Sequence, residues 1–418
     1  MAIDRRNFLR VAGMAGASLA LGACAKDDGG GSANNAAAPS MSPKSKPVVD
    51  LKGEPVAALF TSLNNDYYAS WGLGAERAVK ALGGDYRAFT NEGDAARQIS
   101  QFEQQVQDGV KIFFMTAPDP ANVPTIAKLA NQKKVFLTNT WEMVPWTTPF
   151  DYGPSYVTYF TTDTVSLAYD VATDLFGQMG NKGNLVHLTG HPGSTPDSQR
   201  TLGLDRALKD NPDVKLIARQ PGEWNRDDAR TAMAGIITKY GSDINGVFGQ
   251  NDDVAIGAMN ALNEQSITGV PITGVDGNKG TMDFIKSGAI YGSYSTFPFW
   301  NAGFSAVRAI DAFLGVKFDP LERQLFTGGA FITRDNVDAY LGTFFGEQDV
   351  FDWQLMSRKA HPDDWDPQNK VWPLDVDAMW SFAPKPKGWT EPEAYAKAKG
   401  NADEEAAEYE SHWKIKLL

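Results

Sequence analysis

The chain has 418 residues, of which 42% are hydrophobic and 22% charged, and its formal net charge is −12. This length exceeds one ordinary domain and suits two or three, while the composition is that of a globular protein with a sizeable core. The negative charge argues against nucleic acid as a partner, because phosphate binding requires clustered Lys and Arg. The single cysteine, Cys24, excludes a disulfide within the chain.

Residues 1–24 are predicted to be an export signal and not part of the fold. Arg5 and Arg6 begin a segment that resembles the twin-arginine export signal. The apolar run that follows is shorter than the roughly 20 residues that are needed to span a bilayer, and it suits the core of a signal peptide. The sequence Leu-Gly-Ala-Cys ending at Cys24 resembles a lipobox. We therefore expect a lipid on Cys24, which would tether the mature protein to a membrane surface.

Residues 25–52 are predicted to be a flexible tether. Gly, Ser, Ala, Asn, Pro and Lys dominate this stretch, and large apolar side chains are almost absent from it. Such a composition buries too little surface to offset the entropy of ordering the chain.

From residue 53 onward, short apolar runs alternate with helical patterns. In the first half, strands are predicted at 56–60, 86–89, 112–115 and 135–137, and helices at 68–82, 93–108 and 121–131. The alternation restarts near residue 165. Helices are predicted there at 165–179, 196–209, 226–239, 252–264 and 279–287, and strands at 184–188, 214–218, 246–248, 271–275 and 291–295. This pattern predicts an α/β fold of two Rossmann-like lobes with parallel sheets, and a ligand cleft beyond the carboxyl ends of the strands.

Five strand-end segments resemble the ribose-binding-like, type I periplasmic binding proteins. They occur in the family's order and at similar spacing, at 61–68, 193–203, 220–224, 247–258 and 274–277. The resemblance implies two lobes joined by a hinge. It assigns residues 53–161 and 297–325 to the N-terminal lobe, and 162–296 and 326–335 to the C-terminal lobe.

The same resemblance implies which residues bind ligand in the cleft. Asn65, Arg200, Asn251 and Asp276 are expected to bond the hydroxyl edge of a sugar, since amide, guanidinium and carboxylate groups hydrogen-bond hydroxyls strongly. Tyr67, Tyr68 and Trp224 are expected to stack on the apolar faces of the sugar. Each has a structural alternative: a helix cap for Asn251, a turn for Asp276, an ion pair for Arg200 and lobe packing for the tyrosines.

The sequence departs from the family's pattern after the fourth predicted strand. Where sugar binders often carry an Asp-Arg pair, this chain has Asn139, Thr140 and Trp141, and Thr296 stands where a Gln is common. Asn139 and Thr296 can still bond hydroxyls, and Trp141 offers another stacking face. These changes argue against ribose itself and leave other sugars, polyols, cyclitols or an unrelated polar solute open.

The last segment, 336–418, is longer than the family requires. It contains six of the eleven tryptophans, at positions 353, 365, 372, 380, 389 and 413, and its end near 391–414 is predicted to be helical. Two interpretations remain open at this point: the segment packs on the lobes, or it forms a docking surface for a partner.

An enzyme is disfavoured, because the chain has no Gly-x-Ser-x-Gly, His-Glu-x-x-His or Walker-type motif. His191 follows a predicted strand and is a further candidate for the cleft. We expect no cofactor and no metal. The predicted function is periplasmic capture of a polyhydroxylated small molecule and its delivery to the permease of an ABC transporter. Docking of the loaded protein on a membrane signalling sensor, or binding of a non-sugar solute, is the alternative.

Overall fold

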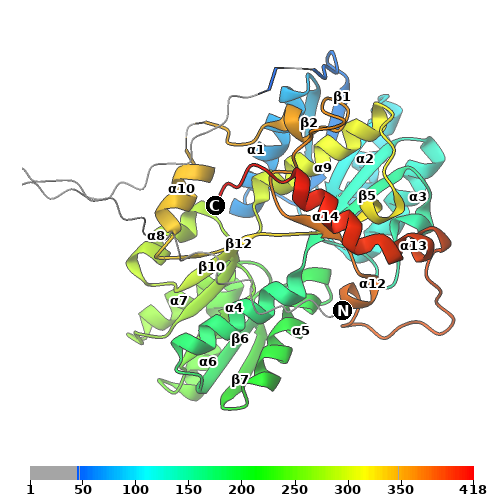
Figure 1. Cartoon of the computed structure of the whole chain (residues 1–418). Helices are drawn as coiled ribbons and strands as arrows, with labels where there is room; N and C mark the ends of the chain where they lie inside the picture. The colour runs from blue at the N-terminus through cyan, green and yellow to red at the C-terminus, as the bar shows by residue number, and fades with distance from the viewer. Residues whose placement is uncertain (1–44, 47, 347) are drawn as a thin grey trace, which may run out of the picture. The chain divides into compact units, whose positions relative to one another are not determined.

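Two mostly parallel β-sheets, each covered by helices, form the body of the protein (Figure 1). The computed structural model describes residues 45–418 except 47 and 347, and all of these belong to one compact unit. Cys24 and the predicted export signal lie outside the described residues. Within residues 45–418, apart from those two gaps, none of the helices combines the length and hydrophobicity that a membrane span requires.

The described residues place seven strands in the sheet of the first lobe, in the order β13-β11-β5-β4-β3-β1-β2. The strands are β1 (Pro55–Phe60), β2 (Asp85–Thr90), β3 (Ile112–Thr116), β4 (Phe136–Thr140), β5 (Tyr156–Thr162), β11 (Gln324–Thr327) and β13 (Val371–Pro373). The helices on this sheet are α1 (Asp66–Ala81), α2 (Ala95–Gln107), α3 (Val123–Lys133) and α9 (Pro298–Phe313). All pairings are parallel except that of β13 with β11. Helices α1 and α9 contribute to one core cluster, and α2 and α3 contribute to the other, so β3 is buried along its whole length.

The second lobe has a six-stranded sheet over the described residues, in the order β12-β10-β9-β8-β6-β7. Its strands are β6 (Gly183–Thr189), β7 (Val214–Pro221), β8 (Gly246–Gly249), β9 (Ile272–Asp276), β10 (Gly292–Ser295) and β12 (Ala330–Thr333). Its helices are α4 (Thr164–Gln178), α5 (Thr195–Asp210), α6 (Arg226–Tyr240), α7 (Asp252–Glu264), α8 (Lys279–Ser287) and α10 (Val337–Phe344). Only β12 runs antiparallel to its neighbour, β10. The predicted α/β class with two lobes is confirmed.

The predicted elements all occur, with bounds that differ by a few residues. The strands β5, β11, β12 and β13 were missed. In β5 the sequence mixes threonines with aromatic side chains, and all seven of its residues are buried. Two of its threonine hydroxyls find partners from the neighbouring segment: Thr158 Oγ1 donates to Glu322 O at 3.4 Å, and Thr162 Oγ1 lies 3.4 Å from Thr327 Oγ1. The sequence pattern therefore looked too polar for a core strand.

The segment after α10 packs on the first lobe, so the packing interpretation is the one that the structure supports. It contains α11 (Trp353–Met356), β13, α12 (Val376–Met379), α13 (Glu393–Ala398) and α14 (Ala402–His412). Trp353, Trp365 and Trp380 are buried in it. Figure 1 shows α13 and α14 on the first lobe, where α14 contacts β13. We call residues 346–418 the C-terminal extension.

The chain passes between the two lobes several times. It leaves the first sheet after β5, returns between β10 and α9, and leaves again between β11 and β12. Helix α10 packs against α8 of the second lobe, and the chain then returns to the first lobe before α11. The C-terminal extension, which brings the chain back to β13 of the first sheet, therefore adds a fourth crossing to the three before it.

Candidate ligand-binding cleft

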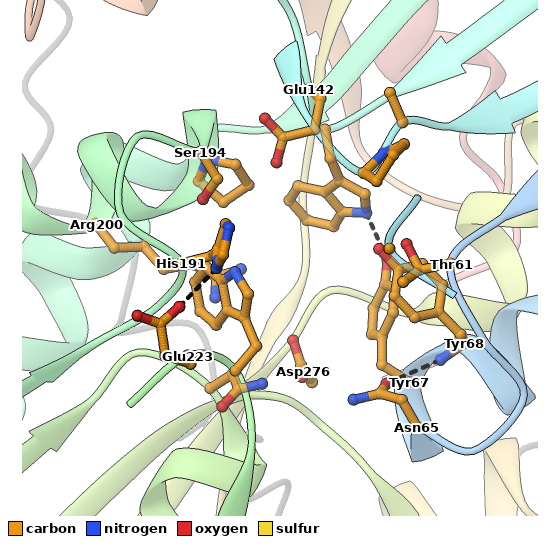
Figure 2. Close-up of a pocket in the computed structure, with 17 residues that line it drawn as sticks. Thr61, Asn65, Tyr67, Tyr68, Glu142, His191, Ser194, Arg200, Glu223 and Asp276 are labelled. Atoms are coloured by element: carbon orange, nitrogen blue, oxygen red, sulfur yellow. Dashed lines mark hydrogen bonds and ion pairs between the residues drawn. The ribbon is translucent and has the colours of Figure 1, made fainter. Parts of the chain in front are cut away.

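A cavity of about 380 Å³ lies where the carboxyl ends of the strands of both lobes face each other. Eight of the ten ligand-binding residues predicted from the sequence line it: Asn65, Tyr67, Tyr68, Trp141, Arg200, Trp224, Asn251 and Asp276. Most lie at or just after the carboxyl end of a strand, and Arg200 lies on α5, the helix that follows β6; parallel strands present their carboxyl ends at one edge of a sheet. Figure 2 shows Tyr67, Tyr68 and Asn65 opposite His191 and Glu223, with Asp276 between the two groups.

The first lobe supplies an aromatic wall. The Tyr67 and Tyr68 rings lie edge to face with centroids 5.3 Å apart, and Tyr67 meets Trp141 at 6.1 Å in the same way. The indole Nε1 of Trp141 donates to the Tyr67 hydroxyl at 2.7 Å (Figure 2). The hydrogen bond fixes both rings, so the wall presents flat apolar surface in a set orientation.

Arg200 on α5 lies against two indoles, one from each lobe. Its guanidinium carbon lies 5.2 Å from the ring centroid of Trp224 and 5.9 Å from that of Trp141. One terminal nitrogen donates to Gln250 O at 2.5 Å, whereas the buried Nε has no hydrogen-bond partner. A buried guanidinium with a free N–H is costly unless a ligand oxygen satisfies it.

The Trp224 ring requires a glycine beside it. A Cβ on Gly190 would lie 1.9 Å from the indole, so only glycine allows the ring to approach the end of β6. Trp224 and its neighbour Glu223 have φ angles of 58° and 51°. Trp141 has a φ of 69° and Asp276 one of 129°. Positive φ costs non-glycine residues on the order of 1–3 kcal/mol and occurs mainly where surrounding structure enforces it, often at binding sites.

Asp276 ends β9 and is buried at the centre of the cleft. Burial raises the pKa of this carboxyl well above its usual value, and the positive charge of Arg200 partly opposes the rise. Two hydrogen bonds fix the turn that follows Asp276. The Tyr340 hydroxyl donates to Gly277 O at 2.7 Å, and Asp252 Oδ2 accepts from Asn278 N at 2.7 Å. The carboxyl of Asp276 is therefore positioned by the protein and left available to a ligand.

The two asparagines both cap helices, and they differ in what remains free. Asn251 Oδ1 accepts from Val254 N at 2.8 Å, which leaves its amide nitrogen for the cavity. Asn65 Oδ1 accepts from Tyr68 N at 3.2 Å, and its amide nitrogen donates to Asp253 Oδ2 at 3.1 Å. Asn65 is thus a helix cap and a link between the lobes, and these two roles account for its main hydrogen bonds.

Two of the residues named from the sequence do not line the cavity. Asn139 is buried in β4, where its amide donates to Glu142 O at 2.7 Å and to the Tyr156 hydroxyl at 3.0 Å. It supports the loop that carries Trp141. Thr296 is fully buried beside Tyr67: burial raises the pKa of that tyrosine, and the Thr296 hydroxyl opposes part of the rise, so Thr296 lies behind the aromatic wall.

Sequence reasoning missed several lining residues: Thr61, Gly93, Ala117, Pro118, Glu142, Ser194, Pro196 and Glu223. His191, named only as a further candidate, does line the cavity, and its Nδ1 lies 2.6 Å from Glu223 Oε2. The most informative omission is Glu142, which immediately follows Trp141. A carboxylate directly beyond the end of a strand was a signal that could have identified it.

Glu142 is buried and connects the lobes. Its Oε2 accepts from Thr195 N, the first residue of α5, at 2.9 Å, and Thr195 Oγ1 donates to Met143 O at 3.0 Å. Burial raises the pKa of Glu142 to about 8, while the bonds from Thr195 oppose the rise. The side chain is therefore mostly a neutral carboxylic acid at pH 7, able both to donate to and to accept from a hydroxyl.

Glu142→Gln should change the pH dependence of the stability of the ligand-free protein. The pKa of Glu142 is about 8 in the folded protein and about 4.5 in the unfolded chain. Its contribution to the free energy of unfolding is therefore fully present below pH 4.5 and is lost as the pH rises through 8. The loss is on the order of 1.4 kcal/mol for each pH unit over which the two states differ. Denaturant unfolding at pH 5, 7 and 9 should show the wild type losing stability relative to the variant. Parallel curves would contradict the raised pKa.

The arrangement is that of a binding site. Within the described ranges, no group of three or more His, Cys, Asp or Glu side chains is placed to hold a metal ion. The site consists of flat apolar rings facing hydrogen-bonding groups that are positioned but partly unsatisfied. Such a site suits a small polar molecule enclosed between two lobes.

Fold and cleft together define a two-lobed, solute-binding protein of the α/β class. Residues 56–317 match the family described as periplasmic binding protein domain. The chain belongs to the periplasmic binding protein family, whose members bind solutes and are not enzymes. Membership indicates a periplasmic location.

Individual relatives support the same assignment. A xylitol-binding protein of Mycolicibacterium smegmatis is 35% identical over 176 residues, which are 42% of this chain and 49% of that protein. The match therefore spans about half of that relative's length. A ribose import binding protein of Salmonella typhimurium is 24% identical over 58% of this chain and 79% of its own length.

Two solved structures share the fold. A twin-arginine translocation pathway signal protein from Burkholderia phytofirmans has a TM-score of 0.68 and 30% identity, over 71% of this chain and 95% of its own. A solute-binding protein of an ABC transporter from Actinobacillus succinogenes, with bound D-allose, has a TM-score of 0.64 and 22% identity. That match covers 68% of this chain and 99% of its own. The type I fold is confirmed.

Proposed function

We propose that this protein captures a neutral sugar or polyol between its two lobes and delivers it to an ABC transporter. The observation that carries the proposal is the pairing of an aromatic wall with Arg200 and Asp276, a buried cation and a buried carboxyl that both face the cavity. Rings match the C–H faces of a sugar, and the two charged groups match its hydroxyl edge. Relatives named for xylitol and ribose belong to the same ligand class.

The charges in the cleft favour a neutral ligand over an anionic one. Three carboxyl groups line the cavity, those of Glu142, Glu223 and Asp276, against the single guanidinium of Arg200. Burial keeps Glu142 mostly neutral and raises the pKa of Asp276, so the cost of binding an anion comes mainly from its desolvation, which the guanidinium of Arg200 alone would have to offset. Sugar acids and sugar phosphates should therefore bind far more weakly than the corresponding neutral compounds.

A thermal-shift screen tests both statements. We expect neutral monosaccharides, polyols or cyclitols to raise the melting temperature. At a hundredfold excess of ligand over the dissociation constant, the free energy of unfolding should rise by about 2.7 kcal/mol. Xylitol and xylonate form a matched pair that differs in charge, and only the neutral member should stabilise. A shift confined to amino acids, nucleosides or sugar acids would overturn the proposal and leave the fold assignment intact.

We further propose that a lipid on Cys24 holds the exported protein at a membrane. The lipobox-like sequence and the paired arginines support this, and a structural relative is named for the twin-arginine pathway. Mass spectrometry of the membrane-extracted protein should find the lipid on Cys24, and Cys24→Ser should release the protein into the soluble fraction. Cross-linking of the loaded protein in membranes separates a transporter permease from a signalling sensor as the partner.

A further inference from the structure

We propose that the C-terminal extension is a positioning element of the ligand cleft: its segment 376–382 ties helix α5, which carries Arg200, to the first lobe. The inference rests on the proposed capture of a ligand between the lobes. It assigns a role to a part of the chain that lies beyond residues 56–317, the range matched by the family.

The extension is firmly attached to the first lobe on both sides of this segment. Before it, β13 extends the first sheet by pairing with β11. After it, Trp389 Nε1 donates to Trp146 O at 2.5 Å, and Trp146 Nε1 donates to Ala383 O at 3.1 Å. The two indole rings meet at 5.2 Å. Trp380 is buried in the core cluster of α2 and α3. These contacts hold the segment as part of the first lobe.

The same segment bonds to α5 of the second lobe. Gln199 Nε2 lies 3.3 Å from Met379 O and 2.8 Å from Met379 Sδ, and both side chains are buried. About two turns further along the helix, Arg206 Nη2 donates to Ser381 Oγ at 3.2 Å. The contact therefore runs along the helix and combines a buried part with an exposed part.

These bonds act on the cleft through a single helix. Gln199 directly precedes Arg200, so α5 presents one residue to the extension and the next to the cavity. The start of the same helix is already bonded to the first lobe, through Thr195 and Glu142. With the extension attached, α5 is held to the first lobe from Thr195 to Arg206.

Separation of the lobes would break this series of contacts, so the extension favours the arrangement in which Arg200 faces Trp141. The apparent affinity of a binding protein falls in proportion to the fraction of molecules that are in the arrangement able to bind ligand. If that arrangement is already populated without ligand, less affinity is lost. The additional crossing between α10 and α11 acts in the same direction, because it shortens the range over which the lobes can move apart.

The test measures the distance between the lobes without any ligand, so its result does not depend on the proposed ligand class. In a Cys24→Ser background, Glu103→Cys on α2 and Lys209→Cys on α5 place two exposed spin labels, one on each lobe. The tie is removed by Gln199→Leu together with Arg206→Ala. Leucine removes both the bond to Met379 and the buried Gln199 Oε1, which has no partner, so the one group that loses its donor is Met379 O. Both substitutions lie on α5, so the attachment of the extension to the first lobe is unchanged.

We expect one dominant distance in the parent protein and a second, longer distance in the tie variant, with the ratio of longer to shorter rising roughly tenfold for the two lost bonds. Tyr395→Phe is the matched control, because it removes a bond of the extension to Leu374 O that does not involve the second lobe. An unchanged distance distribution in the tie variant overturns the proposal. So does an equal change in the control, since both variants would then report only a loosened extension.

Discussion

Asp276→Asn should abolish ligand binding while the protein remains folded. The carboxyl is buried at the centre of the cleft beside Arg200, and it is the group most completely available to ligand hydroxyls. Ligand hydroxyls together with Arg200 favour the ionised carboxylate in the complex, where each hydrogen bond to it contributes about 1.5–3 kcal/mol, so loss of two lowers affinity roughly 10²-fold or more. Isothermal titration with the sugar or polyol that gives the largest thermal shift measures the loss.

The stability of the ligand-free variant provides the control for this experiment. Because burial raises the pKa of Asp276, its charged form destabilises the folded state as pH rises. Asparagine carries no charge and keeps the shape of the side chain, so the melting temperature at pH 8 should be unchanged or higher. The difference between variant and wild type should shrink toward pH 4. Retained affinity in a folded variant would remove Asp276 from the site.

Arg200→Lys should weaken binding roughly 10²-fold even though the charge is kept. The planar guanidinium lies against Trp224 and Trp141, donates to Gln250 O, and has an Nε without a partner in the protein. An ammonium group cannot stack on two indoles or serve two acceptors in a plane. The measurement is again the dissociation constant, determined at two salt concentrations.

A charge-preserving substitution elsewhere on the same helix is the matched comparison. Lys209 is exposed in the last turn of α5. It does not line the cavity and takes part in none of the contacts between the lobes described above, so Lys209→Arg should leave the affinity within about twofold of the wild type. If Arg200→Lys bound the ligand as tightly as Lys209→Arg, a point charge would suffice and the stacked geometry would have no role in recognition.

The sequence alone predicted the fold class and most of the cleft. The period and the length of the apolar runs identified nine strands, and all nine occur in the structure. Eight of the ten predicted binding residues line the cavity, because residues that follow parallel strands must meet at one edge of each sheet. The position at which a strand ends is a local property of the sequence, and it can be predicted without knowing which residues of the other lobe face that end.

Asn139, which was predicted to line the cavity and does not, and Glu142, which lines it and was not predicted, show where such reasoning stops. Asn139 lies inside β4, one residue before the strand ends, and the direction of its side chain depends on the twist and register of the sheet. Glu142 was overlooked for the opposite reason. Nothing near it in the sequence indicates burial, which comes from α5 of the other lobe, 53 residues further along the chain.

The extension is the clearest case of a feature that only the tertiary structure decides. Its tryptophan content indicated that it would be ordered, since so many large apolar side chains must find a partner surface. Which surface they find depends on pairings between residues far apart in sequence, such as Trp146 with Trp389 and Gln199 with Met379. Composition and period determine what a segment can form locally. The position of α5 and of Arg200 relative to the aromatic wall is set by contacts that come together only when both lobes and the extension are folded.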